Sequence, residues 1–485
     1  MSNALPHIKD LDEDAKVHHF DVHEGEDATD VVISDAERKR LVWKIDRQLM
    51  PLIWIMYIFN YLDRTNIGNA QLAGLSEDLG MTSQDYNWAL SVFFFGYVIF
   101  EIPSNMLLSR SRPSVFLPTI MAIWGGLCCC MAAIRNLGGL MALRFILGCV
   151  EAGFAPGVLF LMSSWYTQAE QARRFAIYWS AAVASGSFGG LLAGAITSRL
   201  DGAAGLEGWR WLFIIEGVAT VIVSLAAFKL LLDFPETAKG FTQDERAKIM
   251  ARLRQDGHAD MQTRERTVTP MRAFIMAVSD WRVWGLVLIY SMIVGAGTIS
   301  YFIPVLTQSL GYSRVTAQYM TIPIYMVSLV VCIAVAISSD YFNDRRYHIA
   351  AASALGFAAS VVAAAVLQPT VRYVMLCFMA AGVWSALPLA LTWTSNTIKW
   401  PREKRAIALA MVNALGNLSS VYGSRIWPDW TAPQYAIGFG VTAGFLGAAV
   451  VLAVVLGWAY LKFPHDAFVV KQMAKVRREP APSAV

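Results

Sequence analysis

The chain has 485 residues, of which 56% are hydrophobic and only 16% carry a formal charge. Soluble domains contain about 25% charged residues, so this composition excludes an ordinary soluble protein and indicates a chain embedded largely in lipid. The formal net charge of +4 is too small to indicate a nucleic-acid-binding protein.

The first 45 residues are polar and rich in acidic side chains, as the runs KDLDEDAK and HEGEDATD show. Such a composition buries too little apolar surface to offset the cost of ordering the chain. No cleavable signal peptide opens the sequence. We therefore expect residues 1–45 to form a disordered acidic tail in the cytosol.

Twelve apolar blocks follow, several of them interrupted by Gly, Pro or a polar residue. A helix needs about 20 apolar residues to cross a hydrocarbon core about 30 Å thick, and each block meets this need. Their ranges are 48–72, 86–108, 113–134, 138–166, 172–198, 209–233, 283–309, 316–339, 346–367, 371–399, 403–427 and 434–463. The sequence therefore predicts an all-α membrane protein with twelve transmembrane helices.

A polar stretch separates the sixth block from the seventh, and it predicts a division into two halves. We expect six-helix bundles at 46–233 and 283–465, a cytosolic central loop at 234–282 and a cytosolic tail at 466–485. The Glu, Ala, Arg and Leu content of the loop favours a short amphipathic helix outside the membrane. The run RRFAIYWSAAVASGSFGG resembles KRAIALAMVNALGNLSS 231 residues later, which suggests pseudo-symmetric bundles.

Lysine and arginine gather in the even-numbered loops and in both flanking segments, whereas the first loop, AGLSEDLGMTSQDYN, has neither. Basic residues favour the cytosolic side of a membrane. We therefore expect a multi-pass protein, in the plasma membrane, with both termini in the cytosol.

Away from the ends of the predicted spans lie six acidic or basic side chains, and all of them belong to the N-terminal half. They are Asp63, Arg64, Glu101, Arg144, Glu151 and Glu216. Each costs at least ~2.5–3.5 kcal/mol to insert, so such residues usually serve a function. Because the second half lacks equivalents, we interpret the asymmetry as one site with its coupling chemistry on one wall. Glu101 is expected to be structural or gate-forming, and Glu216 structural.

Helical rise places Asp63, Arg64 and Glu151 at similar depth, roughly 12–16 Å from the outer ends of their helices. Arg64 offers a planar fork that suits a carboxylate. A carboxyl group in a poorly hydrated site favours its neutral form, so Glu151 or Asp63 is expected to carry a proton. Ionised Glu151 would pair with Arg64 or Arg144, and protonation would free an arginine for an anion. The alternative is that Asp63–Arg64 and Arg144–Glu151 are structural pairs.

Several motifs resemble the anion:cation symporter family of the major facilitator superfamily. They include YLDRTNIGNA in the first helix and RFILGCVEAGFAPG in the fourth. FEIPSNMLL, GWRWLFIIEG and DFPETAKGFTQDER are similar to the fungal allantoate-permease-like branch. The resemblance covers roughly residues 40–465. It implies the major facilitator fold, alternating access, a monomer and proton-driven uptake of a carboxylate, such as a vitamin-like or amino-acid-derived one.

The resemblance also implies roles for the buried charges. Arg64 matches the arginine that binds the substrate carboxylate. Asp63 and Glu151 match the acidic pair implicated in proton coupling, and Arg144 matches their partner arginine.

Substrate contacts carried over from the family are aromatic and polar. Tyr61 and Tyr97 match tyrosines near the sugar-acid substrate of bacterial relatives, and Trp393 and Asn413 match contacts from the second half. Trp393 stands only six residues before Lys399, so Trp384 is kept as a rival.

Three further residues complete the predicted site. Tyr301 in SYFIPVL is expected to contact the substrate, because the seventh helix, on which it lies, commonly gates such pores. Asp340 and Arg345 in SSDYFNDRR are expected to form an interdomain charge contact. Ala182 stands where bacterial sugar-acid members have a glutamine, which argues against copying their substrate.

Three functions remain open from the sequence: a symporter importing an organic anion, an exporter of the same fold, and a nutrient sensor without transport. The short tail after the last helix disfavours the sensor. An enzyme is not expected, because no HExxH motif, paired catalytic histidine or nucleophile elbow is present. Neither a metal nor a cofactor is expected. The expected partners are protons, a small organic anion and the lipid bilayer.

Overall fold

The computed structural model describes residues 34–108, 111–238, 240–255, 269–398 and 401–463. Within these residues the regular structure is entirely helical, as predicted. The expected C-terminal tail at 466–485 and residues 1–33 of the expected N-terminal tail lie outside the described part. The rest of that N-terminal tail differs from the expectation, because residues 35–45 form the first turns of a helix.

Helices of the N-terminal half follow the predicted blocks closely. They are α1 (Asp35–Leu72), α2 (Leu75–Asp78), α3 (Ser83–Leu108), α4 (Pro113–Met131), α5 (Leu137–Glu151), α6 (Phe154–Trp165), α7 (Gln168–Leu200) and α8 (Gly208–Leu230), with a 3₁₀ turn η1 (Ala203–Gly205). The predicted fourth span is divided between α5 and α6.

The C-terminal half begins after α9 (Gln243–Gln255). It contains α10 (Pro270–Val278), α11 (Trp281–Gly297), η3 (Thr298–Tyr301), α12 (Ile303–Gln308), α13 (Arg314–Tyr341), α14 (Arg346–Ala365), α15 (Pro369–Thr397), α16 (Arg402–Asn417), α17 (Ser419–Gly423), η4 (Asp429–Thr431) and α18 (Ala436–Lys462). The helix expected in the central loop is therefore present as α9.

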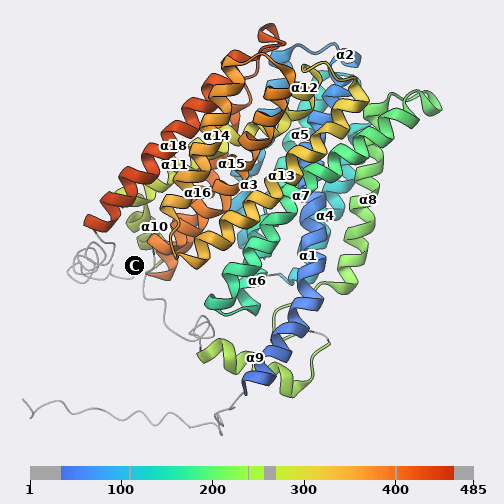
Figure 1. The fold of residues 1–485 in the computed structure, drawn as a ribbon. Coiled ribbons are helices and arrows are strands. Elements are labelled where there is room, and N and C mark those ends of the chain that lie inside the picture. Colours follow the sequence, from blue (N-terminus) through green and yellow to red (C-terminus); the bar gives the residue numbers. More distant parts are fainter. Residues whose placement is uncertain (1–33, 109–110, 239, 256–268, 399–400, 464–485) are drawn as a thin grey trace, which may run out of the picture.

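Ten helical stretches in the described residues are long and apolar enough to cross a membrane. The long helices α1 and α3 run alongside them (Figure 1). With 38 and 26 residues, these two are about 57 and 39 Å long, which also suffices to cross a bilayer. The structure thus agrees with twelve transmembrane helices in two six-helix bundles.

Each half packs mainly within itself. In the first half α4 packs on α8 and α3 on α5, and in the second half α14 packs on α15 and α18. The halves meet chiefly along α7 and α13. Small residues allow close helix approach in lipid, and Gly148 on α5 lies against the backbone of Phe93 on α3.

Gly148→Ala is expected to destabilise the protein by about 1–3 kcal/mol, because the added methyl group would overlap the Phe93 carbonyl oxygen. Thermal unfolding in detergent measures the effect. Gly126→Ala is the matched control, since a methyl group there meets nothing within 4 Å. Equal unfolding temperatures for the two variants would contradict the close packing of α3 and α5.

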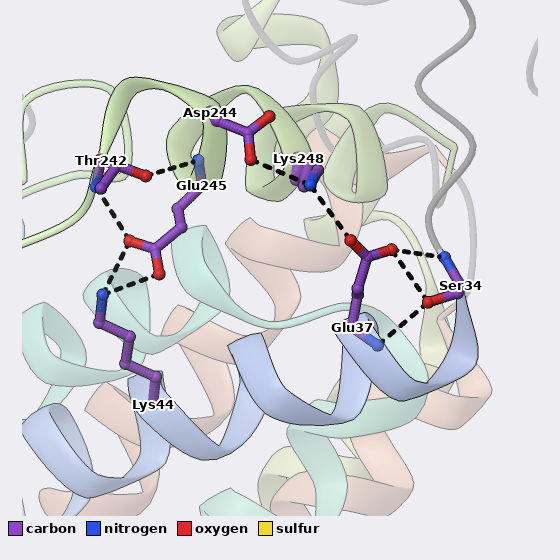
Figure 2. A network of polar contacts seen from close by, with 7 residues as sticks. All are labelled: Ser34, Glu37, Lys44, Thr242, Asp244, Glu245 and Lys248. Atoms are coloured by element: carbon purple, nitrogen blue, oxygen red, sulfur yellow. Dashed lines mark hydrogen bonds and ion pairs between the residues drawn. The ribbon is translucent and has the colours of Figure 1, made fainter.

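Helix α9 lies at one end of the molecule beside the start of α1, and α2 lies at the opposite end (Figure 1). We name these the α9 end and the α2 end. Figure 2 shows Lys44 of α1 bonded to both carboxylate oxygens of Glu245, at 2.9 and 2.7 Å, while Lys248 reaches Glu37 at 3.2 Å. The bonds from Lys44 and Thr242 hold the pKa of Glu245 below its usual range. This contact therefore persists at neutral pH and weakens as the pH falls through that lowered pKa.

Side-chain bonds between the two halves gather toward the α2 end. The hydroxyl groups of Ser91 and Ser424 lie 3.1 Å apart, Tyr86 donates to the Tyr301 carbonyl at 3.4 Å, and Thr197 donates to Gln318 at 2.6 Å. These contacts hold the halves together on that side of the molecule.

Candidate functional site

A narrow cavity of about 60 Å³ lies between the two halves. Such a volume holds a few water molecules. The N-terminal half lines it with Tyr61, Arg64, Thr65, Phe94 and Trp179, and the C-terminal half with Tyr290, Val294, Gly297, Thr298, Ser300, Tyr301, Trp384, Leu387, Asn417 and Ser420. Arg64 is the charged member of this lining, and aromatic and apolar side chains make up much of the rest.

Two interrupted helices position the site. Helix α5 ends at Glu151, five residues before Pro156, whose ring nitrogen cannot donate the helical bond to the Ala152 carbonyl. Helix α11 gives way to η3 at Thr298, and Tyr325 donates at 3.4 Å to the Ser300 carbonyl that Pro304 leaves free. Interrupted helices at mid-membrane are typical of transporter binding sites.

Arg64 and Glu151 form a buried ion pair. The Nε and Nη2 atoms of Arg64 donate to the same Glu151 oxygen at 2.8 and 2.5 Å. The two side chains are 9% and 0% exposed. The pair confirms the matching depth deduced from helical rise, and it chooses Arg64 over Arg144 as the partner of Glu151.

Aromatic rings surround the Arg64 guanidinium group. Its central carbon lies 5.3, 5.1 and 4.9 Å from the rings of Tyr61, Phe93 and Tyr97. Rings at this distance attract a cation while excluding water. Arg64 therefore stays charged at the cavity wall and depends on Glu151 as its anion in this structure.

Breaking a buried ion pair by removing one partner costs about 3–5 kcal/mol, because the other charge remains uncompensated. A competing anion must therefore replace Glu151 at Arg64, or Glu151 must become neutral. This exchange is what the Arg64–Glu151 arrangement can do chemically.

Arg144 does not pair with Glu151. Its Nε donates to the Ala89 carbonyl at 3.4 Å and its guanidinium carbon lies 4.9 Å from the Phe93 ring. The side chain is fully buried, and its Nη1 and Nη2 atoms find no hydrogen-bond partner among the described residues.

Asp63, which was expected to share proton coupling with Glu151, points away from the cavity and from Glu151. Its carboxylate accepts hydrogen bonds from Trp124 at 3.0 Å, Cys128 at 3.4 Å and Thr220 at 2.7 Å. Adjacent residues on a helix point about 100° apart, so Arg64 facing the cavity turns Asp63 toward α4 and α8.

Of the two tryptophans on α15, Trp384 lines the cavity and its ring meets Tyr61 at 5.7 Å. Trp393, expected to contact substrate, instead packs 5.5 Å from Tyr460 within the C-terminal bundle. Trp384, the alternative to Trp393, is therefore the tryptophan of α15 that lines the cavity. Asn413, also expected at the substrate, donates its amide to Glu101 at 2.8 Å.

Tyr301, expected to contact the substrate, lines the cavity. The expected interdomain contact of Asp340 and Arg345 takes another form. The two side chains bond to each other, and Arg345 also donates to Ser339 at 2.7 Å, so the pair joins α13 to the turn before α14 inside one bundle. The contact stays within one half because only four residues separate Asp340 from Arg345 in the sequence.

Sequence reasoning missed several cavity residues, among them Trp179, Thr298, Asn417 and Ser420. They are uncharged, so nothing about their cost in lipid distinguishes them from packing residues. Asn417 could have been identified from the sequence, because a side-chain amide inside a predicted span needs a hydrogen-bond partner.

Three comparisons bear on this site and fold. A family model described as Major Facilitator Superfamily matches residues 53–424. MFS transporter prlL from Fungal sp. (strain NRRL 50135) is 35% identical over 440 residues, which cover 88% of each chain. A putative tartrate transporter from Agrobacterium vitis is 28% identical over 88% of this chain and 93% of that protein.

Among solved structures, a bacterial homologue of the human lysosomal transporter Spinster, in an inward-facing and unoccupied conformation, matches with a TM-score of 0.66. The match covers 89% of this chain and 99% of that one at 17% identity. It shows a shared fold.

Proposed function

The chain belongs to the Major Facilitator Superfamily, a family of transporters rather than enzymes, and from this premise we propose that it is a proton-coupled symporter of a small organic anion. The buried ion pair of Arg64 and Glu151 beside the cavity carries this proposal. A neutral substrate would not need a buried arginine at the cavity wall. The carboxylate that holds this arginine can be neutralised by a proton, which would link protonation to anion binding.

The proposed mechanism is an exchange of anions at Arg64. When Glu151 takes a proton its charge is lost, and Arg64 becomes available to the substrate carboxylate. Binding and protonation therefore favour each other, because each removes the competitor of the other. Release of the anion at the other face lets Glu151 lose its proton and return to Arg64.

The finer family assignment also belongs to this proposal. We propose that the chain belongs to the anion:cation symporter family, on the motifs around Arg64 and Glu151. The runs FEIPSNMLL, GWRWLFIIEG and DFPETAKGFTQDER favour its allantoate-permease-like branch. The relative described as a putative tartrate transporter supports a carboxylate substrate. We further propose a plasma-membrane location, and from the distribution of basic residues we infer that both termini lie in the cytosol.

Uptake into proteoliposomes tests the function. Purified protein is given a panel of labelled carboxylates and neutral sugars, with the outside acidified or at equal pH. We expect one or more carboxylates to accumulate against their gradient only when the outside is acidic. Accumulation of a neutral sugar, or of an anion regardless of the pH gradient, would contradict the proposal.

Trp384→Ala is expected to raise the KM for the accumulated carboxylate about tenfold, which corresponds to ~1.4 kcal/mol of lost binding. Its ring is part of the cavity wall, so its loss removes contact with the substrate body. Trp393→Ala is the matched control on the same helix. It removes a ring packed on Tyr460 and should lower thermal stability while leaving KM unchanged.

A further inference from the structure

Glu101 is a buried carboxyl group on α3 that the proposed exchange at Arg64 does not use. It is 3% exposed and lies between the cavity and the α9 end, about 10 Å before the end of α3. Its Oε1 accepts a hydrogen bond from the Asn413 amide on α16 at 2.8 Å. Because these residues belong to different halves, the bond ties the two bundles together on this side of the cavity.

Hydrogen bonds connect this tie to the cavity. Asn417 lines the cavity, and its amide donates to the side-chain oxygen of Asn413 at 3.3 Å. Asn413 then donates to Glu101, so three side chains form a line from the cavity wall to α3. A ligand that contacts Asn417 can therefore affect the hydrogen bond between Asn413 and Glu101 through Asn413.

A second connection runs through Arg64. Tyr97 stands one turn before Glu101 on α3, and its ring lies 4.9 Å from the Arg64 guanidinium carbon. Among the described residues, the charged and titratable groups that interact with Glu101 are Arg64 from α1, Tyr97 from α3 and Tyr290 from α11. Arg64 thus interacts with two buried carboxyl groups. It is hydrogen-bonded to Glu151, and it interacts electrostatically, over a longer distance, with Glu101.

We propose that Glu101 is a positioning residue of the transport cycle, whose ionised carboxylate latches the halves through Asn413 and whose protonation weakens the latch. This inference rests on the proposed alternating-access transport and adds a second proton-responsive group to it. Glu151 controls whether Arg64 can hold the substrate, and Glu101 controls whether the α9 side can open.

The direction follows from the chemistry of the bond. An amide that donates to an ionised carboxylate forms a charge-assisted hydrogen bond, about twice as strong as a neutral one. The second oxygen, Oε2, is buried and accepts no hydrogen bond from the described residues. A proton on Oε2 removes a poorly compensated charge and reduces the bond from Asn413 to a neutral one. Acidification should therefore loosen the α9 side.

The distance between spin labels across the α9 end tests the latch in lipid nanodiscs without substrate. Labels at Leu107→Cys on α3 and Asn396→Cys on α15 occupy exposed positions near the ends of their helices, in a background with the six native cysteines replaced. We expect the fraction of molecules with a long distance to rise about fivefold from mildly alkaline to acidic pH. Glu101→Gln should remove this pH dependence.

A reciprocal exchange separates a latch from simple packing. Asn413→Asp places a second carboxylate against Glu101 and should increase the long-distance fraction at alkaline pH. The double variant Glu101→Gln/Asn413→Asp restores one amide and one carboxylate with their positions reversed. It should recover both the short distance and its pH dependence.

A wild-type distance that does not respond to pH, or a double variant as open as Asn413→Asp, would overturn the latch. Because no substrate is present, either result would leave the anion-uptake test of Arg64 and Glu151 unaffected. Failure of anion uptake with an intact pH response would instead contradict the proposed function alone.

Discussion

Arg64→Ala is expected to reduce uptake of the transported carboxylate at least 100-fold in proteoliposomes under an inward proton gradient. The substitution removes the charge that binds the anion and leaves Glu151 buried without a partner, at a cost of about 3–5 kcal/mol. Arg64→Lys keeps the charge but loses the planar fork, so it should retain intermediate activity.

A second substitution separates lost binding from misfolding. The double variant Arg64→Ala/Glu151→Gln leaves no uncompensated charge in the pair, so its thermal stability should approach that of the wild type. Its carboxylate uptake should stay as low as that of Arg64→Ala. Recovery of uptake together with stability would show that Arg64 is structural.

Glu151→Gln is expected to abolish proton-driven accumulation while preserving exchange of labelled for unlabelled anion across the membrane. Glutamine resembles the protonated carboxyl group, so Arg64 stays available to the substrate but no proton can be bound or released. Counterflow at equal pH measures exchange, and uptake under an imposed pH gradient measures coupling.

Glu216→Gln is the matched control for this substitution. Glu216 is 1% exposed and belongs to the same half, but it lies on α8 outside the cavity lining. Its replacement should leave the response to the pH gradient intact. If Glu151→Gln still accumulated the anion fully, or if Glu216→Gln alone lost coupling, a carboxyl group other than Glu151 would carry the coupled proton.

The fold could be predicted well from the sequence because lipid imposes strong requirements on composition and length. The pairing of Arg64 with Glu151 was also accessible, since helical rise alone places both at one depth. Depth does not give the rotation of a helix about its axis. Asp63 shares the depth of Arg64 yet faces α4 and α8.

The same limitation explains the two tryptophans. Trp384 and Trp393 lie nine residues apart on α15, which is two and a half helical turns, so they face opposite sides. A helix with apolar residues all round gives no pattern to distinguish the side facing the cavity. The bond from Asn413 to Glu101 was not predicted either, because it depends on how closely the two halves approach.

Proton uptake on substrate binding is the most direct measurement of the exchange at Arg64. The carboxylate found by uptake is added, fully ionised, to purified protein in weakly buffered detergent solution, and the pH is recorded. The wild type should take up about one proton for each anion bound, because binding at Arg64 and protonation of Glu151 are linked. Glu151→Gln should bind the anion with no such uptake. Binding by the wild type without proton uptake would contradict the exchange of anions at Arg64.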